Sequence, residues 1–235
     1  MIEALADLTD GPIAMERYEG ATGAGVRVAV IDSGVHPGHP HVGEVEPGAA
    51  FDGTGVASDD TVDRLGHGTA VAAAIREKAP QVAIVPVKVF DRELRATAGA
   101  LVAAIDWAVD AGVDLINLSL GTANAAHERR LGEALVRATR AGIGLVAAAE
   151  QDGTRWLPGS FPLAIGVTLD WDCPRHQAQA TVTFEGTRAC LRLRASGYPR
   201  PIPGVPPERN LKGLSFAVAN ATGLLCLHLS RSRRP

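Results

Sequence analysis

VRVAVIDSGV, residues 26–35, is the stretch of this sequence that decides the fold. Its first part, residues 26–31, is a short apolar run rich in valine, which is typical of a strand buried on both faces of a parallel sheet. Asp32 follows this run directly and leaves the sheet at its carboxyl end, where open parallel sheets carry their functional sites. Taken alone, Asp32 is better explained as a strand-end residue that makes turn hydrogen bonds.

The same kind of apolar run recurs along the chain and alternates with helical spacing. We predict further strands at residues 82–89, 113–118, 143–148 and 163–167, and helices at residues 69–78, 98–111, 126–141 and 217–229. Gly112 and Gly142 are placed to end the helices that precede them. This alternation predicts an α/β fold: a three-layer, mostly parallel sheet flanked by helices on both faces.

Two long stretches depart from this rhythm. Residues 36–64 are rich in Gly, Pro and Asp and predict a surface connection. Residues 172–212 are irregular, with strands expected at residues 180–184 and around 190–193 and a proline-rich segment after them.

Composition places the chain among ordinary globular proteins. It has 235 residues, of which 46% are apolar and 21% charged, and its formal net charge is −3. That balance gives no basic field for nucleic acid, and no apolar stretch approaches the roughly 20 residues of a membrane span. We expect one domain over residues 1–235, with residues 1–24 as an N-terminal extension and residues 231–235 as a basic tail.

Targeting and redox signals favour a cytoplasmic protein without a nucleic-acid or membrane partner. The opening residues carry acids from Glu3 onward and lack the apolar region of a secretory signal. Cys173, Cys190 and Cys226 are widely spaced and form no CxxC pair. This usage fits a reducing compartment better than a disulfide framework or a zinc site.

Three side chains carry the chemistry of nucleophilic acyl transfer. Asp32 ends the first strand, His67 lies in GHGTAVAAAI at a helix start, and Ser215 lies in LKGLSFAVANATG at another. A lone His or Ser at a helix start is usually structural, the Ser being a common N-cap. Together they supply a nucleophile, a base and a carboxylate that orients the base. The combination predicts a catalytic triad of Asp32, His67 and Ser215.

Four segments resemble the subtilisin family of serine proteases in their usual order. They are DSG followed by HP, then GHGTAVA, then NLSLG, then GLSFA, and they extend from about residue 25 to residue 229. The resemblance implies a subtilisin-like fold and a serine endopeptidase that works through an acyl-enzyme. It also implies a peptide or protein substrate.

The resemblance extends to a substrate-binding edge. In NLSLG, residues 117–121, it implies that Ser119, Leu120 and Gly121 pair with an extended substrate and line its main specificity pocket. Without the other segments, a buried strand that ends at a glycine would be the better explanation. LPGSFP, residues 157–162, resembles the segment that closes this pocket and includes Gly159.

The sequence departs from the family at the position of its oxyanion donor. VAAAEQDG stands where the family usually reads AAAGN, so Gln151 matches the donor and Glu150 the preceding glycine. Gln151 keeps an amide on a longer stem, and the Ser215 N–H is the second donor. Glu150 and Asp152 beside the pocket suggest a basic substrate side chain, although Arg155 is close enough to neutralise one of them.

No metal or other cofactor is expected. Only REKAPQ lies between the His67 helix and VAIVPVKVF, so the family's calcium-binding loop is missing there. HPGHPH, residues 36–41, carries three histidines but lies in a loop, and solvated loop histidines explain it better than a metal cluster. Asp59, Asp60 and Asp63 are explained equally well as residues that shape substrate access or as a surface acidic turn.

The sequence is compatible with three functions. The first is a serine endopeptidase, specialised for intracellular processing and completed by a partner protein because its loops are short. The second is a catalytically weak or inactive peptide-binding module, which the changes at Gln151 and Leu214 would favour. The third is an esterase or acyl-transferase that uses the same triad with another acceptor.

Overall fold

The computed structural model describes residues 5, 8–185 and 188–232. Its strands are β1 (Gly11–Ala14), β2 (Arg27–Asp32), β3 (Ala49–Phe51), β4 (Ala57–Ser58), β5 (Ala83–Lys88), β6 (Leu115–Leu118), β7 (Gly144–Gln151), β8 (Thr154–Arg155), β9 (Ile165–Leu169), β10 (Gln177–Glu185) and β11 (Arg188–Ala195). Its helices are α1 (His67–Lys78), α2 (Ala98–Asp110), α3 (Glu128–Arg140) and α4 (Leu214–Ser232), with short 3₁₀ turns at Met15–Tyr18, Ala125–His127 and Pro207–Arg209.

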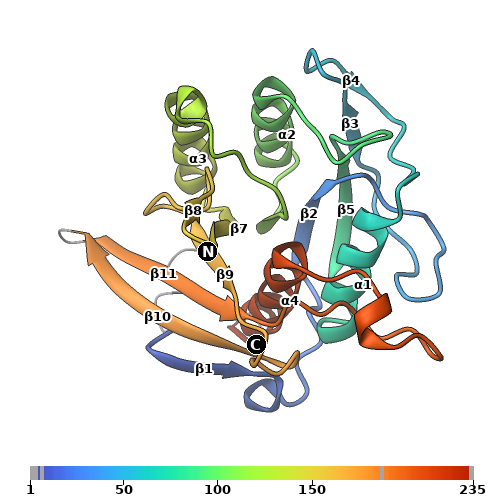
Figure 1. Ribbon diagram of the computed structural model, residues 1–235, viewed down its shortest axis with the longest axis vertical. Coiled ribbons are helices and arrows are strands. Elements are labelled where there is room, and N and C mark those ends of the chain that lie inside the picture. The colour runs from blue at the N-terminus through green and yellow to red at the C-terminus, as the bar shows by residue number, and fades with distance from the viewer. Residues whose placement is uncertain (1–4, 6–7, 186–187, 233–235) are drawn as a thin grey trace.

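One sheet joins these strands in the order β1-β10-β11-β9-β7-β6-β2-β5-β3-β4, with β8 paired to β7. All neighbours from β11 to β3 run parallel, and the antiparallel pairs lie at the two ends of the sheet and in the β7–β8 hairpin. Helices α1 and α4 pack on one face and α2 and α3 on the other (Figure 1). The predicted mostly parallel sheet with helices on both faces is confirmed.

β2 is the central strand of the site. It lies between β5 and β6, and residues Val28–Asp32 are fully buried, as expected for a strand covered on both faces. Asp32 pairs in register with Lys88 of β5, and its carbonyl oxygen accepts the Val89 N–H at 2.8 Å. The carboxylate of Asp32 therefore leaves a rigid backbone at the carboxyl edge of the sheet.

The structure differs from the sequence expectation at both ends of the sheet. The expected N-terminal extension contributes β1, which pairs antiparallel with β10, and the expected surface connection contains β3 and β4. These strands are two to four residues long, too short for a periodic apolar pattern to reveal them. β10 and β11 are longer than predicted and form a hairpin that extends from the body of the molecule (Figure 1).

A buried side chain fixes α4 to the segment that precedes it. Asn220 is fully buried and donates from Nδ2 to the carbonyl oxygens of Ser196 at 2.8 Å and Tyr198 at 3.0 Å. One turn further along, Gly223 packs tightly against α1, where an added Cβ would lie 3.0 Å from Lys78 Cβ and 3.1 Å from the Ile75 carbonyl oxygen. These contacts set the position of α4, which begins beside the predicted nucleophile.

Within the described residues, no helix has both the length and the apolar character that crossing a membrane requires.

Replacing Asn220 tests how strongly this anchor holds α4. Asn220→Leu keeps the number of side-chain heavy atoms but removes the Asn220 donor from the Ser196 carbonyl oxygen and leaves the Tyr198 carbonyl oxygen with Arg175 alone, so we expect the free energy of unfolding to fall by about 1–3 kcal/mol. Urea denaturation followed by circular dichroism measures the change. Thr181→Val, on the exposed side of β10, is the matched polar-to-apolar control and should change it by less than about 0.5 kcal/mol. Equal effects of the two variants would contradict the anchoring role.

Candidate active site

The structure joins Asp32 and His67 by a short hydrogen bond. His67 is the first residue of α1, and its Nδ1 lies 2.7 Å from Asp32 Oδ1. The Asp32 side chain is 0% exposed, and the same Oδ1 accepts the Ser33 N–H at 2.7 Å. A buried carboxylate on Nδ1 fixes the ring orientation and tautomer of a histidine whose other nitrogen can then accept a proton.

The glycine after His67 is required by close packing. A side chain at Gly68 would collide with the Gly34 carbonyl oxygen and would lie 3.2 Å from the Asp32 side chain. The start of α1 can therefore approach the end of β2 only if this position lacks a Cβ. The pairing of His67 with Asp32 thus requires a glycine directly after His67.

Asp63 braces the loop that carries His67. Its carboxylate accepts the Ser33 hydroxyl at 2.8 Å, the Leu65 and Gly66 N–H groups at 2.9 and 2.8 Å, and the Thr69 N–H and hydroxyl at 2.9 and 2.6 Å. The residue is only 8% exposed. The interpretation of Asp63 as part of a surface acidic turn is wrong, because a carboxylate at the start of α1 satisfies helix N–H groups that would otherwise lack acceptors.

Asp59 and Asp60, in contrast, are exposed, as a surface turn predicts. Sequence reasoning could have separated them from Asp63 by position: only Asp63 lies close enough in sequence to Thr69 to cap the first turn of the His67 helix. Ser33 completes the connection, since its hydroxyl oxygen also accepts the Gly68 N–H at 2.9 Å. Asp63 and Asp32 are thus linked through the Ser33 residue.

The two carboxylates make His67 more basic. Burial alone would lower the pKa of His67, but the hydrogen bond and charge of Asp32 and the charge of Asp63 outweigh it and raise that pKa above its ordinary value. Burial likewise opposes ionisation of Asp63, but the hydrogen bonds from Thr69, Leu65 and Ser33 hold its pKa below the usual range. Asp63 is therefore a charged neighbour of His67 at neutral pH.

Ser215 lies in the first turn of α4 and is bonded to the expected substrate-binding edge. Its Oγ donates to the Ser119 carbonyl oxygen at 3.1 Å, and Ser119 Oγ donates to the Ser215 carbonyl oxygen at 3.3 Å. Within the described part of the chain, no hydrogen bond joins Ser215 to His67. Phe216 provides the contact between the two segments, with its ring centre 5.7 Å from that of His67.

A buried polar network holds Ser119 in place. Asn117 Nδ2 donates to Ser119 Oγ at 2.8 Å, and the Thr222 hydroxyl of α4 donates to Asn117 Oδ1 at 2.9 Å. All three side chains are buried, so the network excludes water and joins the end of β6 to α4. The NLSLG segment therefore sets the position of the Ser215 backbone.

Gln151 is the last residue of β7. Its amide Nε2 donates to Asp152 Oδ2 at 3.3 Å, at a tight turn in which Asp152 and Gly153 have φ of 52° and 75°. Glu150 is exposed and faces Arg155 across the β7–β8 hairpin. The roles of Gln151 as an oxyanion donor and of Glu150 as a specificity residue stay predictions.

The remaining expected substrate residues lie in two places. Leu120 and Gly121 follow Ser119 directly, and a Cβ at Gly121 would lie 3.1 Å from Trp156 Cβ. Gly159 packs under β7, where any side chain would collide with the Ala148 carbonyl oxygen. A contact of Leu120, Gly121 or Gly159 with substrate stays a prediction.

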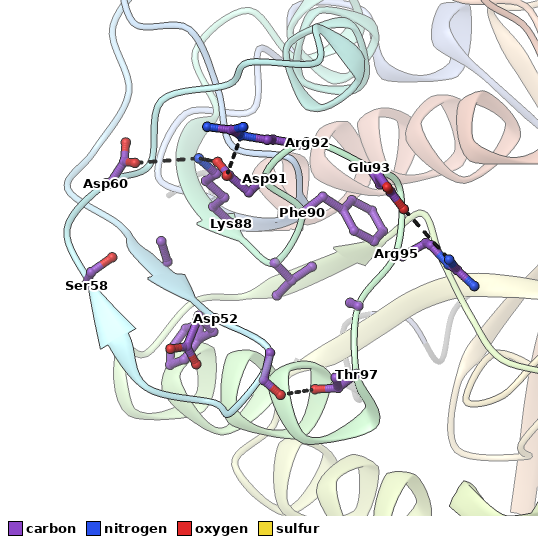
Figure 2. A pocket seen from close by; sticks show the side chains of 15 residues that line it. Asp52, Ser58, Asp60, Lys88, Phe90, Asp91, Arg92, Glu93, Arg95 and Thr97 are labelled. Carbon is purple, nitrogen blue, oxygen red and sulfur yellow. Dashed lines mark hydrogen bonds and ion pairs between the residues drawn. The ribbon is translucent and has the colours of Figure 1, made fainter.

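A cavity of about 710 Å³ lies beside the site, between β3, β4 and the segment that follows β5 (Figure 2). Lys88 reaches into it from β5 and is held by Asp91 at 3.0 Å and Asp60 at 3.7 Å. Because Lys88 opposes Asp32 in the sheet, the cavity begins one strand away from the pair. Figure 2 shows Glu93 and Arg95 paired farther along its wall.

The histidines of the HPGHPH segment line a second cavity of about 310 Å³, next to the start of α1. The rings of His39 and His41 meet edge to face with centres 5.4 Å apart, and His39 Nδ1 accepts the His41 backbone N–H at 3.2 Å. Burial, with the charges of Arg200 and His39, lowers the pKa of His41. Within the described ranges, no three His, Cys, Asp or Glu side chains are grouped so that they could hold a metal ion.

A buried Asp–His pair at the edge of a parallel sheet, beside a helix with a serine in its first turn, is the arrangement of subtilisin-like serine peptidases. The sequence profile of the subtilase family, peptidase S8, matches residues 23–188. The chain belongs to the subtilase family. The profile match includes Asp32 and His67 and ends before Ser215, so the assignment of Ser215 depends on its motif and its position in the structure.

Individual subtilisins match most of the chain. Subtilisin DY from Bacillus licheniformis is 34% identical over 232 residues, which cover 91% of this chain and 80% of that protein. Subtilisin from Bacillus pumilus is 29% identical and covers 90% of this chain and 76% of its own length. Subtilisin E from Bacillus subtilis (strain 168) is also 29% identical over 90% of this chain, but the match spans only about half, 55%, of that protein.

Solved structures show the same fold at lower identity. Sphericase superposes with a TM-score of 0.68 at 24% identity, and the match covers 95% of this chain and 85% of the sphericase chain. A cold adapted subtilisin-like serine proteinase gives a TM-score of 0.65 at 22% identity, and the match covers 90% of this chain and 78% of that protein's chain. The predicted subtilisin-like fold is confirmed.

Asp63 gives a test of the electrostatics of the site. Asp63→Asn removes a negative charge near His67, so the imidazolium loses stabilisation and the pKa of His67 should fall toward its ordinary value. NMR titration of the His67 ring, assigned by its loss in His67→Ala, measures the pKa. Asp59→Asn, an exposed carboxylate in the same segment, is the control and should leave it unchanged. A shift of equal size in both variants would show that Asp63 has no special role.

Proposed function

We propose that the chain is a serine endopeptidase that hydrolyses peptide bonds through Asp32, His67 and Ser215. Ser215 Oγ attacks the peptide carbonyl carbon while its proton passes to His67 Nε2, and His67 then gives that proton to the leaving amine nitrogen. Water attacks the resulting ester, its proton passes to His67, and the Ser215 oxygen leaves and takes that proton. The Asp32 carboxylate holds the ring and stabilises the imidazolium in both steps.

The buried hydrogen bond between Asp32 and His67 is the observation that carries this proposal. A histidine used only for packing has no need of a fully buried carboxylate on Nδ1, because burying that charge costs free energy unless it is paired. The raised pKa of His67 makes it a stronger base for a serine hydroxyl.

Substrate would also help to direct the nucleophile. The Ser119 carbonyl oxygen, which now accepts the Ser215 hydroxyl, belongs to the edge expected to pair with an extended peptide. A peptide N–H that donates to this oxygen would compete with Ser215 Oγ and leave the hydroxyl free to turn toward His67. The N-terminus of α4 then favours the negative charge that develops on the carbonyl oxygen.

A fluorophosphonate probe tests the triad directly. Wild type should gain a single adduct on Ser215, and Ser215→Ala should gain none, as read by intact mass. His67→Ala should lower the labelling rate by at least about 10³-fold, because the hydroxyl loses its base. His127→Ala, at a half-buried histidine directly before α3, should label like wild type. Labelling of Ser215→Ala at the wild-type rate would contradict the assignment.

A second test asks whether Gln151 donates a hydrogen bond to the oxyanion. If its amide turns from Asp152 to the substrate oxygen, Gln151→Ala should lower kcat on a peptide substrate by about 10²- to 10³-fold with little change in KM, a magnitude known from subtilisin. Asp152→Asn is the matched control, because it keeps the turn but weakens the hold on Gln151, and it should not lower kcat. An unchanged kcat in Gln151→Ala would leave the Ser215 N–H as the working donor.

A peptide-binding module is the second candidate. The observation that favours it is the pair of hydrogen bonds that hold the Ser215 hydroxyl on Ser119 and the Gln151 amide on Asp152, both away from His67. In this case peptides would bind to a folded protein that fails to react with the probe. Comparison of ester and amide substrates separates the third candidate, an esterase or acyl-transferase, from a peptidase.

The biological setting is part of the proposal. Among the described residues, Cys173 and Cys226 form no disulfide, which fits action in the cytoplasm. Ile202 and Leu211 are exposed beside the second cavity and offer an apolar surface to a substrate or a completing partner. A role in processing a peptide precursor is our proposal for the pathway.

A further inference from the structure

The segment after β8 crosses the space between the ends of β6 and β7. Thr154 and Arg155 pair with β7, and the next residue continues this pairing, since the Trp156 N–H donates to the Ala149 carbonyl oxygen at 2.8 Å. Leu157 then pairs with Thr122 through two hydrogen bonds of 2.9 and 3.0 Å. The extended chain at Trp156 and Leu157 therefore joins β7 to the residue that follows Ser119–Gly121.

Trp156 and Leu157 point to opposite faces of the sheet, as successive residues of an extended chain do. Leu157 packs into the core that contains α2 and α3, whereas Trp156 packs against the core that contains α1 and α4. The indole thus lies on the face of the sheet from which Ser215 is presented by α4.

Contacts place the Cβ of Trp156 against the end of the expected substrate-binding edge. A Cβ at Gly121 would lie 3.1 Å from Trp156 Cβ and 2.9 Å from the Leu157 carbonyl oxygen, so no gap separates Trp156 from the end of the substrate-binding edge. The indole nitrogen is out of reach of water and has no acceptor among the described residues. Trp156 as a whole is half-buried, so the protein encloses only part of the side chain, including the indole nitrogen.

We propose that Trp156 fills the pocket for the acyl-side residue, the residue whose carbonyl Ser215 attacks, and restricts that residue to small side chains such as Gly or Ala. This inference rests on the proposed function. A large side chain would have to displace an aromatic side chain whose Cβ lies against Gly121 and which packs, partly buried, against the core. A methyl group or a hydrogen needs no such displacement.

The proposal differs from the expectation of a basic substrate residue. Glu150 and Asp152 belong to the exposed β7–β8 hairpin, whereas Trp156 lies at the base of the space between β6 and β7. Steric exclusion by Trp156 acts on every large side chain, including a basic one that Glu150 and Asp152 attract.

Peptidyl diphenyl phosphonates test this inference, because their phosphorus takes the place of the carbonyl carbon that Ser215 attacks. The compounds differ only in the side chain on the carbon bound to phosphorus. They carry the side chain of Ala, Phe or Arg, and the second-order rate constant of Ser215 modification is measured for each. Wild type should react with the Ala compound about 10- to 200-fold faster than with the Phe compound. Trp156→Ala should raise the rate with the Phe compound by a similar factor, and Trp156→Phe should give an intermediate rate.

The control is Trp171→Ala, because Trp171 is 46% exposed and packs against Tyr198 outside the site. It should keep the wild-type ratio of rates. Thermal unfolding shows which variants are folded, and Trp156→Phe, which preserves an aromatic ring, serves if Trp156→Ala does not fold. A merely structural Trp156 would slow all three compounds in parallel without changing their ratio, and that result would overturn the inference.

Diisopropyl fluorophosphate, which carries no amino-acid side chain, separates this inference from the proposed function. If it modifies Ser215 while the Ala and Phe compounds react equally, or while the Arg compound reacts fastest, only the small-residue inference is overturned. If it fails to modify folded wild type, the endopeptidase proposal fails and the inference falls with it.

Discussion

The fully buried Asp32 carboxylate is the constraint around which this site is organised. A charged group in the interior is tolerated only when hydrogen bonds and an ion-pair partner replace the water it has lost. Ser33 and His67 provide them at Oδ1, whereas Oδ2 has no partner among the described residues, and His67 can reach Asp32 only because Gly68 allows α1 to approach β2. The geometry of the base follows from the need to satisfy this one carboxylate.

A second buried carboxylate extends the arrangement to the loop before α1. Asp63 satisfies the backbone at the helix start and holds Ser33, whose hydroxyl in turn accepts the Gly68 N–H. Two negative charges near one imidazole raise its pKa, while the surrounding N–H groups keep Asp63 itself ionised. The polar groups that fold this loop are therefore also the ones that set the basicity of His67.

The other half of the site depends on contacts between β6, β7 and α4. Asn117, Ser119 and Thr222 form a dry hydrogen-bond network that fixes the Ser215 backbone, and Asn220 ties α4 to the preceding segment. The antiparallel segment after β8 closes the space between β6 and β7. The positions of Ser215 and Trp156 thus depend on the same few strand ends.

The sequence by itself determined the strand–helix alternation, the parallel sheet and the segments that carry Asp32, His67 and Ser215. These follow from apolar periodicity and local motifs, which act over a few residues. It did not reveal the short strands β1, β3 and β4, because they are shorter than the period that would identify them. The sequence therefore predicts the structure least well for the residues between the expected strands and helices.

Only the tertiary structure decided where individual polar and aromatic side chains point. Asp63 looks like any acid of a surface turn until Ser33, from another strand end, meets it. The directions of Ser215 Oγ and of the Trp156 indole depend on Ser119 and Gly121, which are distant in sequence. Such contacts form only when separate segments are brought together by the sheet, and no local pattern encodes them.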